Sequence, residues 1–194
     1  MKKAVIFIII GCVLLVSSVG LFIYNEVGSF RAAEESMEIM SSLETEMLSD
    51  APGIIDENDG VMPTRLVNGI NTVGVVSVPS VGIEVPVAAE WSYKNLKKSA
   101  CRYSGTAKDG KLIILAHNYR QHFGSLGKAE TGDEVQFLDV NGTLNVYKIT
   151  NKEILGKYEL ERLTDTDSDL TLFTCTYGGK KRVVVRCEKQ QNEE

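Results

Sequence analysis

Cys175 and Arg182 are the residues whose types and spacing most directly suggest chemistry. Leu170–Cys175 has the alternating pattern of a strand, Thr176–Lys181 contains two glycines and is typical of a turn, and Arg182–Cys187 has the pattern of a return strand. Such a hairpin brings the Cys175 thiol close to the Arg182 guanidinium. A fixed cation beside a cysteine can favour the thiolate or stabilise a carbonyl oxygen that becomes negative. The alternative interpretation is a buried core cysteine beside a solvated arginine.

A histidine follows another predicted strand. Lys111–Ala116 is a short apolar run that predicts a buried strand, and His117 and Asn118 come directly after it. A histidine at that point lies at the rim of a core rather than inside it. Cysteine, histidine and arginine together supply the nucleophile, the acid/base and the oxyanion partner that acyl transfer requires.

The motifs around these residues resemble the active-site signature of the sortases, which are transpeptidases of the Gram-positive cell surface. The resemblance covers roughly residues 70 to 188 and is class B- or D-like. Ala116 is a departure, because many sortases have glycine before the histidine. The matching segments are Ala116-His117-Asn118 followed by Phe123–Leu126, Thr171–Cys175 with Arg182 downstream, and the opening strands within Val73–Val87.

The residues and the resemblance give the same fold class. Valine, isoleucine and threonine are concentrated after residue 70, with glycine and proline between the runs, which favours an all-β body. Strands are predicted at 112–116, 134–139 and 143–151, with one short helix at 91–98. Mostly antiparallel strands suggest a closed or nearly closed barrel. The resemblance implies the eight-stranded sortase barrel with short helices.

The resemblance also implies a reaction and its partners. A surface protein would carry a C-terminal sorting signal of the Leu-Pro-x-Thr-Gly type, and Cys175 would attack it to form a thioacyl enzyme. Arg182 would stabilise the oxyanion or orient the peptide, and His117 would act as acid and then base. Thr174 and Asn118 are candidates for substrate contact or orientation. The acceptor amine would come from a peptidoglycan precursor or from a pilin, and no cofactor is expected.

The N-terminus predicts a membrane anchor. Residues 4–24 are uncharged and mostly apolar, and as a helix they span about 30 Å, enough to cross a bilayer core. Lys2 and Lys3 precede them, so the positive-inside rule places residues 1–3 in the cytoplasm and the later residues outside. Residues 25–70 are predicted to be a helical stalk and linker, 71–190 the sortase catalytic domain, and 191–194 a polar tail.

Three questions about the N-terminal region stay open at this stage. Ser18-Val19-Gly20 could be a signal-peptide cleavage site, although the apolar run continues beyond it. Cys12 lies in a faint lipoprotein-like box and is more simply a membrane-facing side chain. The stalk helix, with apolar residues at three- and four-residue steps, could pack on the domain or on a second copy. The linker contains no evident inhibitory-lid motif, which favours an anchoring role over pilus polymerisation.

Four other residues are potential rivals or partners of the predicted site. His122 lies in a polar run and is expected to face solvent. Arg186 shares a strand face with Arg182, but the strand rise places it about 13 Å further along. Cys101 and Cys187 could pair in a disulfide or remain two separate buried thiols.

Composition and motifs argue against several other functions. The formal charge of -5 argues against nucleic acid as a partner. Asp165-x-Asp167-x-Asp169 lacks the glycine and glutamate of an EF-hand loop, and no zinc spacing occurs, so no metal site is predicted. A papain-like or other cell-wall cysteine peptidase would place its cysteine before its histidine, the reverse of this chain. A non-catalytic, membrane-tethered β-domain that binds a surface partner is the other alternative.

Overall fold

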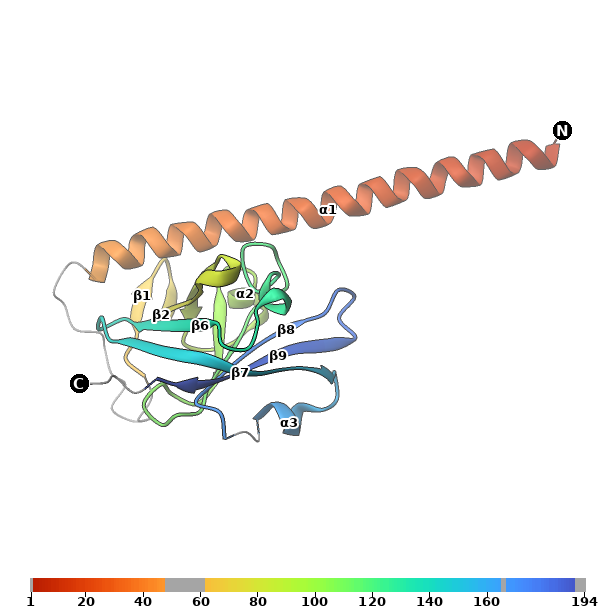
Figure 1. Cartoon of the computed structure of the whole chain (residues 1–194). Helices are drawn as coiled ribbons and strands as arrows, with labels where there is room; N and C mark the ends of the chain where they lie inside the picture. The colour runs from red at the N-terminus through yellow and green to blue at the C-terminus, as the bar shows by residue number, and fades with distance from the viewer. Residues whose placement is uncertain (1, 48–61, 165–166, 191–194) are drawn as a thin grey trace. The chain divides into compact units, whose positions relative to one another are not determined.

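The computed structural model describes residues 2–47, 62–164 and 167–190 of the 194-residue chain. The chain divides into two compact units, residues 1–31 and residues 32–194. Helix α1 (Lys2–Met47) contributes residues to both (Figure 1). Among the described residues, α1 is the one helix long and apolar enough to cross a membrane by length and composition, with a mean hydropathy of 2.9 over its most apolar window. Its apolar side chains before Glu26 are exposed in the structure.

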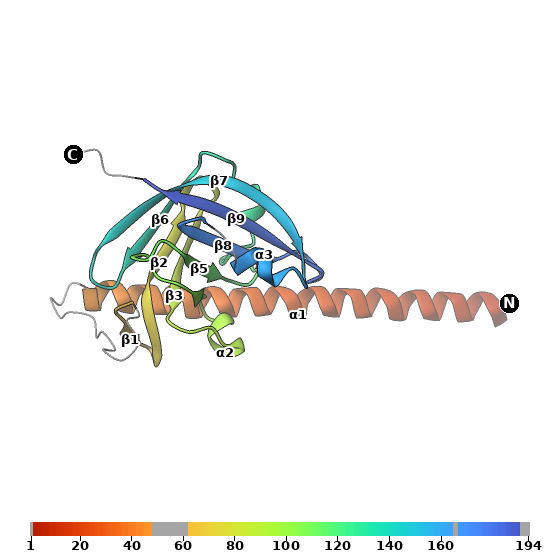
Figure 2. The same cartoon turned by 90° about the horizontal axis from the view of Figure 1, so that it is seen from below.

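Eight strands of the second unit form a closed barrel (Figure 2). The hydrogen-bonded order is β2-β3-β4-β5-β8-β9-β7-β6, and pairing of β6 with β2 completes the circle. A ninth strand, β1, pairs with the start of β2. The all-β barrel expected from the sequence is therefore confirmed. The strands are β1 (Arg65–Val67), β2 (Ile70–Val78), β3 (Ile83–Ala88), β4 (Ala100–Ser104), β5 (Leu112–Leu115), β6 (Glu134–Asp139), β7 (Leu144–Gly156), β8 (Leu170–Cys175) and β9 (Lys181–Lys189).

Short helices connect the strands. They are the 3-10 turns η1 (Pro79–Val81) and η2 (Leu126–Lys128) and the α-helices α2 (Tyr93–Leu96) and α3 (Leu160–Thr164). Helix α2 begins where the Ser92 side chain accepts a hydrogen bond from the Asn95 backbone N–H, which caps its first turn. The predicted helix at 91–98 is thus real but shorter. The sequence did not predict strand β4, helix α3 or strand β1. Strand β1 lies within the expected linker.

Barrel closure depends on Gly74. Strand β2 has an irregular register between Thr72 and Gly74, and the Gly74 φ of 155° belongs to a region that side chains rarely adopt. A Cβ at this position would lie 2.2 Å from the Leu138 carbonyl oxygen on β6. Glycine therefore allows β6 to approach β2 closely enough to complete the ladder.

The core has an interior and an exterior layer. Along β8, Leu170 and Leu172 face the barrel interior, whereas Phe173 packs outside with Ile113 and Val184. This alternation agrees with the two faces predicted for Leu170–Cys175. Full burial of each such side chain stabilises the fold by about 1.5–3 kcal/mol.

Residues 32–47 of α1 pack on the barrel. Ile39 and Leu43 are almost fully buried in a cluster with residues of β1–β4, among them Ile70. Glu35 forms an ion pair of 3.7 Å with Lys98, and the Asn68 amide donates to the Ser42 hydroxyl over 3.4 Å. The sequence left open whether this helix packs on the domain or on a second copy, and in the structure it packs on the barrel. Residues 48–61 of the expected linker lie outside the described part of the chain.

Candidate active site

Cys175 and Arg182 are direct partners across the β8–β9 hairpin. Both are half-exposed, and their register matches the one predicted from the sequence. The Thr176 N–H donates to the Lys181 carbonyl over 2.9 Å, and Gly178 and Gly179 supply the positive φ angles of the turn. Arg182 Nη1 donates to the Gly179 and Lys181 carbonyls, each over 3.2 Å. These bonds hold the guanidinium at the turn that follows the cysteine strand.

His117 lies at the same end of the barrel, on the opposite side of β8. Strand β5 runs parallel to β8 with Leu115 opposite Phe173, so His117 and Cys175 each follow that pair by two residues. Beyond the ladder, the Ala116 N–H donates to the Phe173 carbonyl over 3.3 Å. The three predicted side chains thus come from the level ends of adjacent strands β5, β8 and β9.

Thr174 connects the two strands from the interior. Its side chain is buried, and its hydroxyl donates to the Ala116 carbonyl over 2.8 Å. Because strand neighbours alternate between faces, Thr174 points away from the face that carries Cys175. The hydrogen bond fixes the backbone that leads directly into His117. Asn118 follows His117 and is half-exposed.

The environment of His117 favours its neutral form. Burial lowers the pKa of His117 below its ordinary value of 6.5, and the positive charge of Lys97, just beyond α2, lowers it further. A neutral imidazole can accept a proton from a nearby thiol, which is the first requirement of a general base.

The loop that follows His117 is tightly built. The Tyr119 carbonyl accepts the N–H groups of His122 and Gly124 over 3.0 and 2.9 Å, and the Phe123 N–H donates to the His117 carbonyl over 3.0 Å. A Cβ on Gly124 would lie 2.6 Å from the Tyr119 carbonyl oxygen. Phe123 is fully buried in the interior core, which fixes the far side of the loop.

The prediction for His122 is wrong, because the side chain is fully buried rather than solvent-facing. Neither ring nitrogen has a hydrogen-bond partner of good geometry within the described residues. Burial, and to a smaller extent the charge of His117, lowers the pKa of His122 from 6.5 to about 4, although the Ala32 backbone of α1 partly offsets the shift. The polar residues next to His122 in the sequence did not indicate that helix α1 covers its side chain.

Arg186 has a different environment from Arg182. It is only 6% exposed and pairs with Glu153 on β7 over 3.1 Å. Its Nη1 also donates to the Leu163 carbonyl and the Thr171 hydroxyl, and its Nη2 donates to the Arg162 carbonyl. These bonds tie α3 to the outer face of β8 and β9. Arg186 therefore performs a structural task in the fold.

Cys101 and Cys187 are separate buried thiols. Cys101 lies in the exterior cluster beneath α1 and Cys187 in the barrel interior, and both are free. Burial raises the pKa of Cys101 to about 11 and that of Cys187 to about 12. In the described part of the chain, no group of three potential ligands could hold a metal. Asp165 lies outside that part.

An aromatic row on the outer face was missed by sequence reasoning. Tyr103 packs edge-on against Phe173 with ring centroids 5.7 Å apart, and Trp91 stacks on Tyr103 at 6.4 Å. Phe173 shares its strand face with Cys175, two residues away. Trp91 and Tyr103 are the accessible members of the row, whereas Phe173 is buried beneath them. Trp91 is the only tryptophan of the chain, but its position before α2 gave no signal of this partner.

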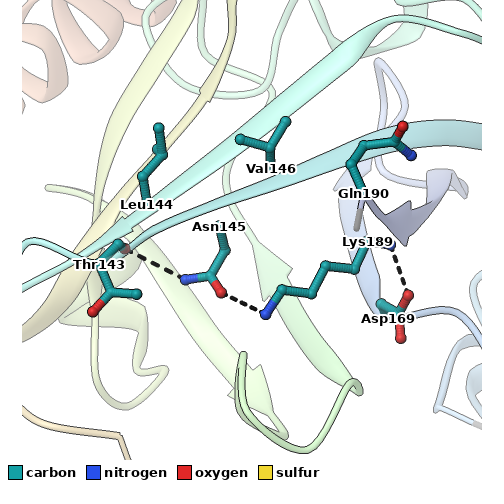
Figure 3. A pocket seen from close by; sticks show the side chains of 7 residues that line it. All are labelled: Thr143, Leu144, Asn145, Val146, Asp169, Lys189 and Gln190. Atoms are coloured by element: carbon teal, nitrogen blue, oxygen red, sulfur yellow. Dashed lines mark hydrogen bonds between the residues drawn. The ribbon is translucent and has the colours of Figure 1, made fainter. Parts of the chain in front are cut away.

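The cavity drawn in Figure 3 lies at the other end of the hairpin. It has a volume of about 630 Å³, and its lining includes Asn145, Asp169 and Lys189. Lys189 donates through its side chain to Asn145 Oδ1 and through its backbone to Asp169 Oδ2, each over 2.7 Å. Asp169 precedes Cys175 by six residues, about 20 Å along a strand. The cavity is thus distinct from the Cys175 site.

Comparison with known proteins adds the family. A sequence model of the sortase domain matches residues 76–190. Sortase C from Clostridium perfringens SM101 is 19% identical with a TM-score of 0.54 over 90% of this chain and 97% of that chain. Sortase C1 from Streptococcus agalactiae is 19% identical with a TM-score of 0.56 over 81% and 90%, and the sortase C1 from Streptococcus suis is 22% identical with a TM-score of 0.53 over 62% and 73%.

These structural likenesses, all below 25% identity, concern the fold. A comparison with curated proteins gives no match. The sortase-domain match covers more than half of the chain and includes strands β3 to β9 complete. The chain therefore belongs to the sortase family.

Proposed function

We propose that this sortase is a cysteine transpeptidase that acts on surface proteins with a C-terminal signal of the Leu-Pro-x-Thr-Gly type. The observation that carries the proposal is the level arrangement of His117, Cys175 and Arg182 at the ends of three adjacent strands. The substrate class comes from the resemblance of the motifs around these residues. Acyl transfer to an amine uses all three side chains in one cycle.

In the first half of the cycle, Cys175 forms a bond to the carbonyl carbon that precedes the scissile amide. His117, neutral at rest, takes the thiol proton as the sulfur attacks, and the electron pair of the C=O bond moves to the oxygen. Arg182 stabilises this oxyanion. Collapse of the tetrahedral species breaks the C–N bond, and the imidazolium of His117 protonates the departing amine. A thioester remains.

In the second half, an incoming amine attacks the thioester carbon. His117 accepts the proton that the amine loses and returns it to the sulfur of Cys175 as the new amide forms. The amine belongs to a peptidoglycan precursor or to a pilin side chain. Proton and electron counts balance over the cycle without a cofactor.

Thr174 and Asn118 act as orienting residues in this proposal. The hydrogen bond from Thr174 to the Ala116 carbonyl fixes the backbone next to His117, and Asn118 lies on the half-exposed side where a peptide can contact it. Trp91 and Tyr103, the accessible rings of the aromatic row, offer apolar contact area to the leucine and proline of the signal.

We also propose that residues 4–24 anchor the chain as a single-pass helix with the barrel outside the cell. Lys2 and Lys3 before the apolar stretch support this orientation. Protease added to intact protoplasts should then degrade the barrel, and the mature protein should keep Lys2. A mature N-terminus at Leu21 would contradict the uncleaved anchor while leaving export intact.

The decisive test of the transpeptidase is peptide cleavage. The full chain in detergent micelles is presented with a library of fluorogenic sorting-signal peptides, with and without candidate amines. We expect cleavage, amine-dependent product, and a thioacyl adduct on Cys175 detected by mass spectrometry. Cys175→Ala should abolish all three, because no other described cysteine outside α1 is exposed. Cleavage that survives in Cys175→Ala would exclude the mechanism. An unreactive Cys175 thiol in the wild type would favour the non-catalytic β-domain.

A further inference from the structure

Three rings form a row that begins at His117. The Tyr119 ring lies 4.7 Å from the His117 ring between centroids, at an interplanar angle of 39°, and 5.6 Å from the His122 ring at 48°. At these distances neighbouring rings are in contact. Tyr119 is half-exposed, whereas His122 is fully buried. The row therefore leads from the proposed acid/base into the protein.

Helix α1 backs the buried end of the row. The Ala32 backbone interacts with the His122 imidazole, and Ala32, Ala33 and Ser36 are all buried. His122 cannot swing outward without displacing this segment. The buried His122 ring and this segment of α1 thus lie behind Tyr119, which is itself half-exposed.

The Tyr119 ring is not needed to build the loop. The hydrogen bonds that define the loop use the Tyr119 carbonyl, which any residue supplies, and Phe123 fixes the loop in the core. The Tyr119 ring adds a contact on one side of the His117 imidazole. Such a contact restricts rotation of the imidazole and excludes water from one of its faces.

We propose that Tyr119 is a positioning residue for His117, held in place from behind by His122. The proposal rests on the proposed function, in which His117 transfers the proton between Cys175 and the amines. Correct placement of an acid/base matters because a displacement of about 1 Å can cost roughly 10²-fold in rate. Loss of the ring should misplace His117 and also hydrate it.

The charged and titratable groups around His117 are few. Lys97 near α2 acts on it electrostatically, Cys175 and Arg182 lie at the level ends of the neighbouring strands, and Tyr119 and His122 form the row. Neither Tyr119→Ala nor Tyr119→Phe replaces any of the other groups in this set. A change in the His117 titration in such variants therefore reports on hydration and placement of the ring.

The chain contains only two histidines, which makes the test direct. The full chain is labelled with ¹³Cε1-histidine in micelles and gives two resonances, of which the one missing from His122→Phe belongs to His122. We expect the His117 pKa to lie below 6.5 in the wild type and to rise toward 6.5 in Tyr119→Ala, because water stabilises the imidazolium. Tyr119→Phe, which keeps the ring, should titrate like the wild type. Tyr158→Ala, at a tyrosine that is 86% exposed, is the matched control.

Peptide cleavage gives the second readout. In Tyr119→Ala, kcat should fall by roughly 10-fold or more, and the acid limb of the kcat/KM profile should move by the same amount as the His117 titration. An unchanged His117 titration in Tyr119→Ala overturns the proposal, as does Tyr119→Phe behaving like Tyr119→Ala. If the titration moves but the wild type cleaves no peptide, or its pH profile stays in place, the positioning contact stands and the proposed function fails.

Discussion

Arg182 and Arg186 lie on the same strand β9, four residues apart, and have opposite surroundings. Arg182 is half-exposed beside Cys175 and bonds to carbonyls of its own turn, whereas Arg186 is buried and bonds to Glu153 and to carbonyls near α3. His117 and His122 form a parallel pair in one loop, the first half-exposed and the second fully buried. In each pair, the residue at the end of the barrel is half-exposed, and the other one is buried in the fold.

The largest expected effect separates the two histidines. His117→Ala should lower kcat/KM by roughly 10³-fold, within the range that general acid/base groups contribute. His122→Phe should retain most of the wild-type turnover, because it keeps the ring behind Tyr119. The measurement is cleavage of a fluorogenic sorting-signal peptide at neutral pH. If His122→Phe were inactive and His117→Ala active, His122 rather than His117 would be the acid/base.

The two arginines should differ next. Arg182→Ala should lower turnover by roughly 10²-fold or more, which is the usual cost of losing one oxyanion donor. Arg182→Lys should recover only part of the rate, because it keeps the charge but loses the planar fork. Thermal unfolding should change little in either variant, since Arg182 is half-exposed and its bonds stay within the turn. Full activity in Arg182→Ala would contradict its proposed role.

Removal of Arg186 should act mainly on stability. Arg186→Ala should lower the free energy of unfolding by about 3 kcal/mol, at the low end for a broken buried pair because the Glu153 side chain keeps 22% exposure. Urea denaturation followed by circular dichroism measures this loss, and kcat per folded molecule should stay near the wild-type value. A stable but inactive Arg186→Ala would mean that the two arginines exchange roles.

The smallest effect concerns acid stability. His122 has its pKa lowered from 6.5 to about 4, so the unfolded chain binds its proton before the folded chain does. The stability that His122 contributes is complete above pH 6.5 and is lost as the pH falls from 6.5 toward 4. His122→Phe has no imidazole to take up a proton on unfolding. As the pH falls from 6.5 toward 4, the Tm of His122→Phe should therefore fall by a few degrees less than that of the wild type. An equal fall in Tm for the two proteins over this pH range would refute the lowered pKa of His122.

The sequence predicted where Arg182 and His117 lie at the strand ends, but not the environments of Arg186 and His122. The β8–β9 register followed from local alternation and a glycine turn, both of which lie within one hairpin. Burial of His122 depends on Ala32, ninety residues earlier in the chain, and the partner of Arg186 is Glu153 on β7. Strand β1 was missed for a similar reason, since its Val67 is buried in the cluster that contains Ile39 and Leu43 of α1. Local patterns cannot reveal contacts that tertiary packing creates.

The placement of the cysteines has a practical consequence for chemical labelling. Cys101 and Cys187 are fully buried and have raised pKa values, so a thiol reagent in water meets neither as a thiolate. Cys12 lies within the apolar stretch of α1, and if that stretch is anchored in the bilayer as proposed, a charged, water-borne reagent does not reach it. Cys175 alone is both outside that stretch and open to solvent among the described residues. A charged methanethiosulfonate should thus label Cys175 stoichiometrically in the native chain, with no cysteine removed beforehand, and under the proposed function the label counts the nucleophiles in the population.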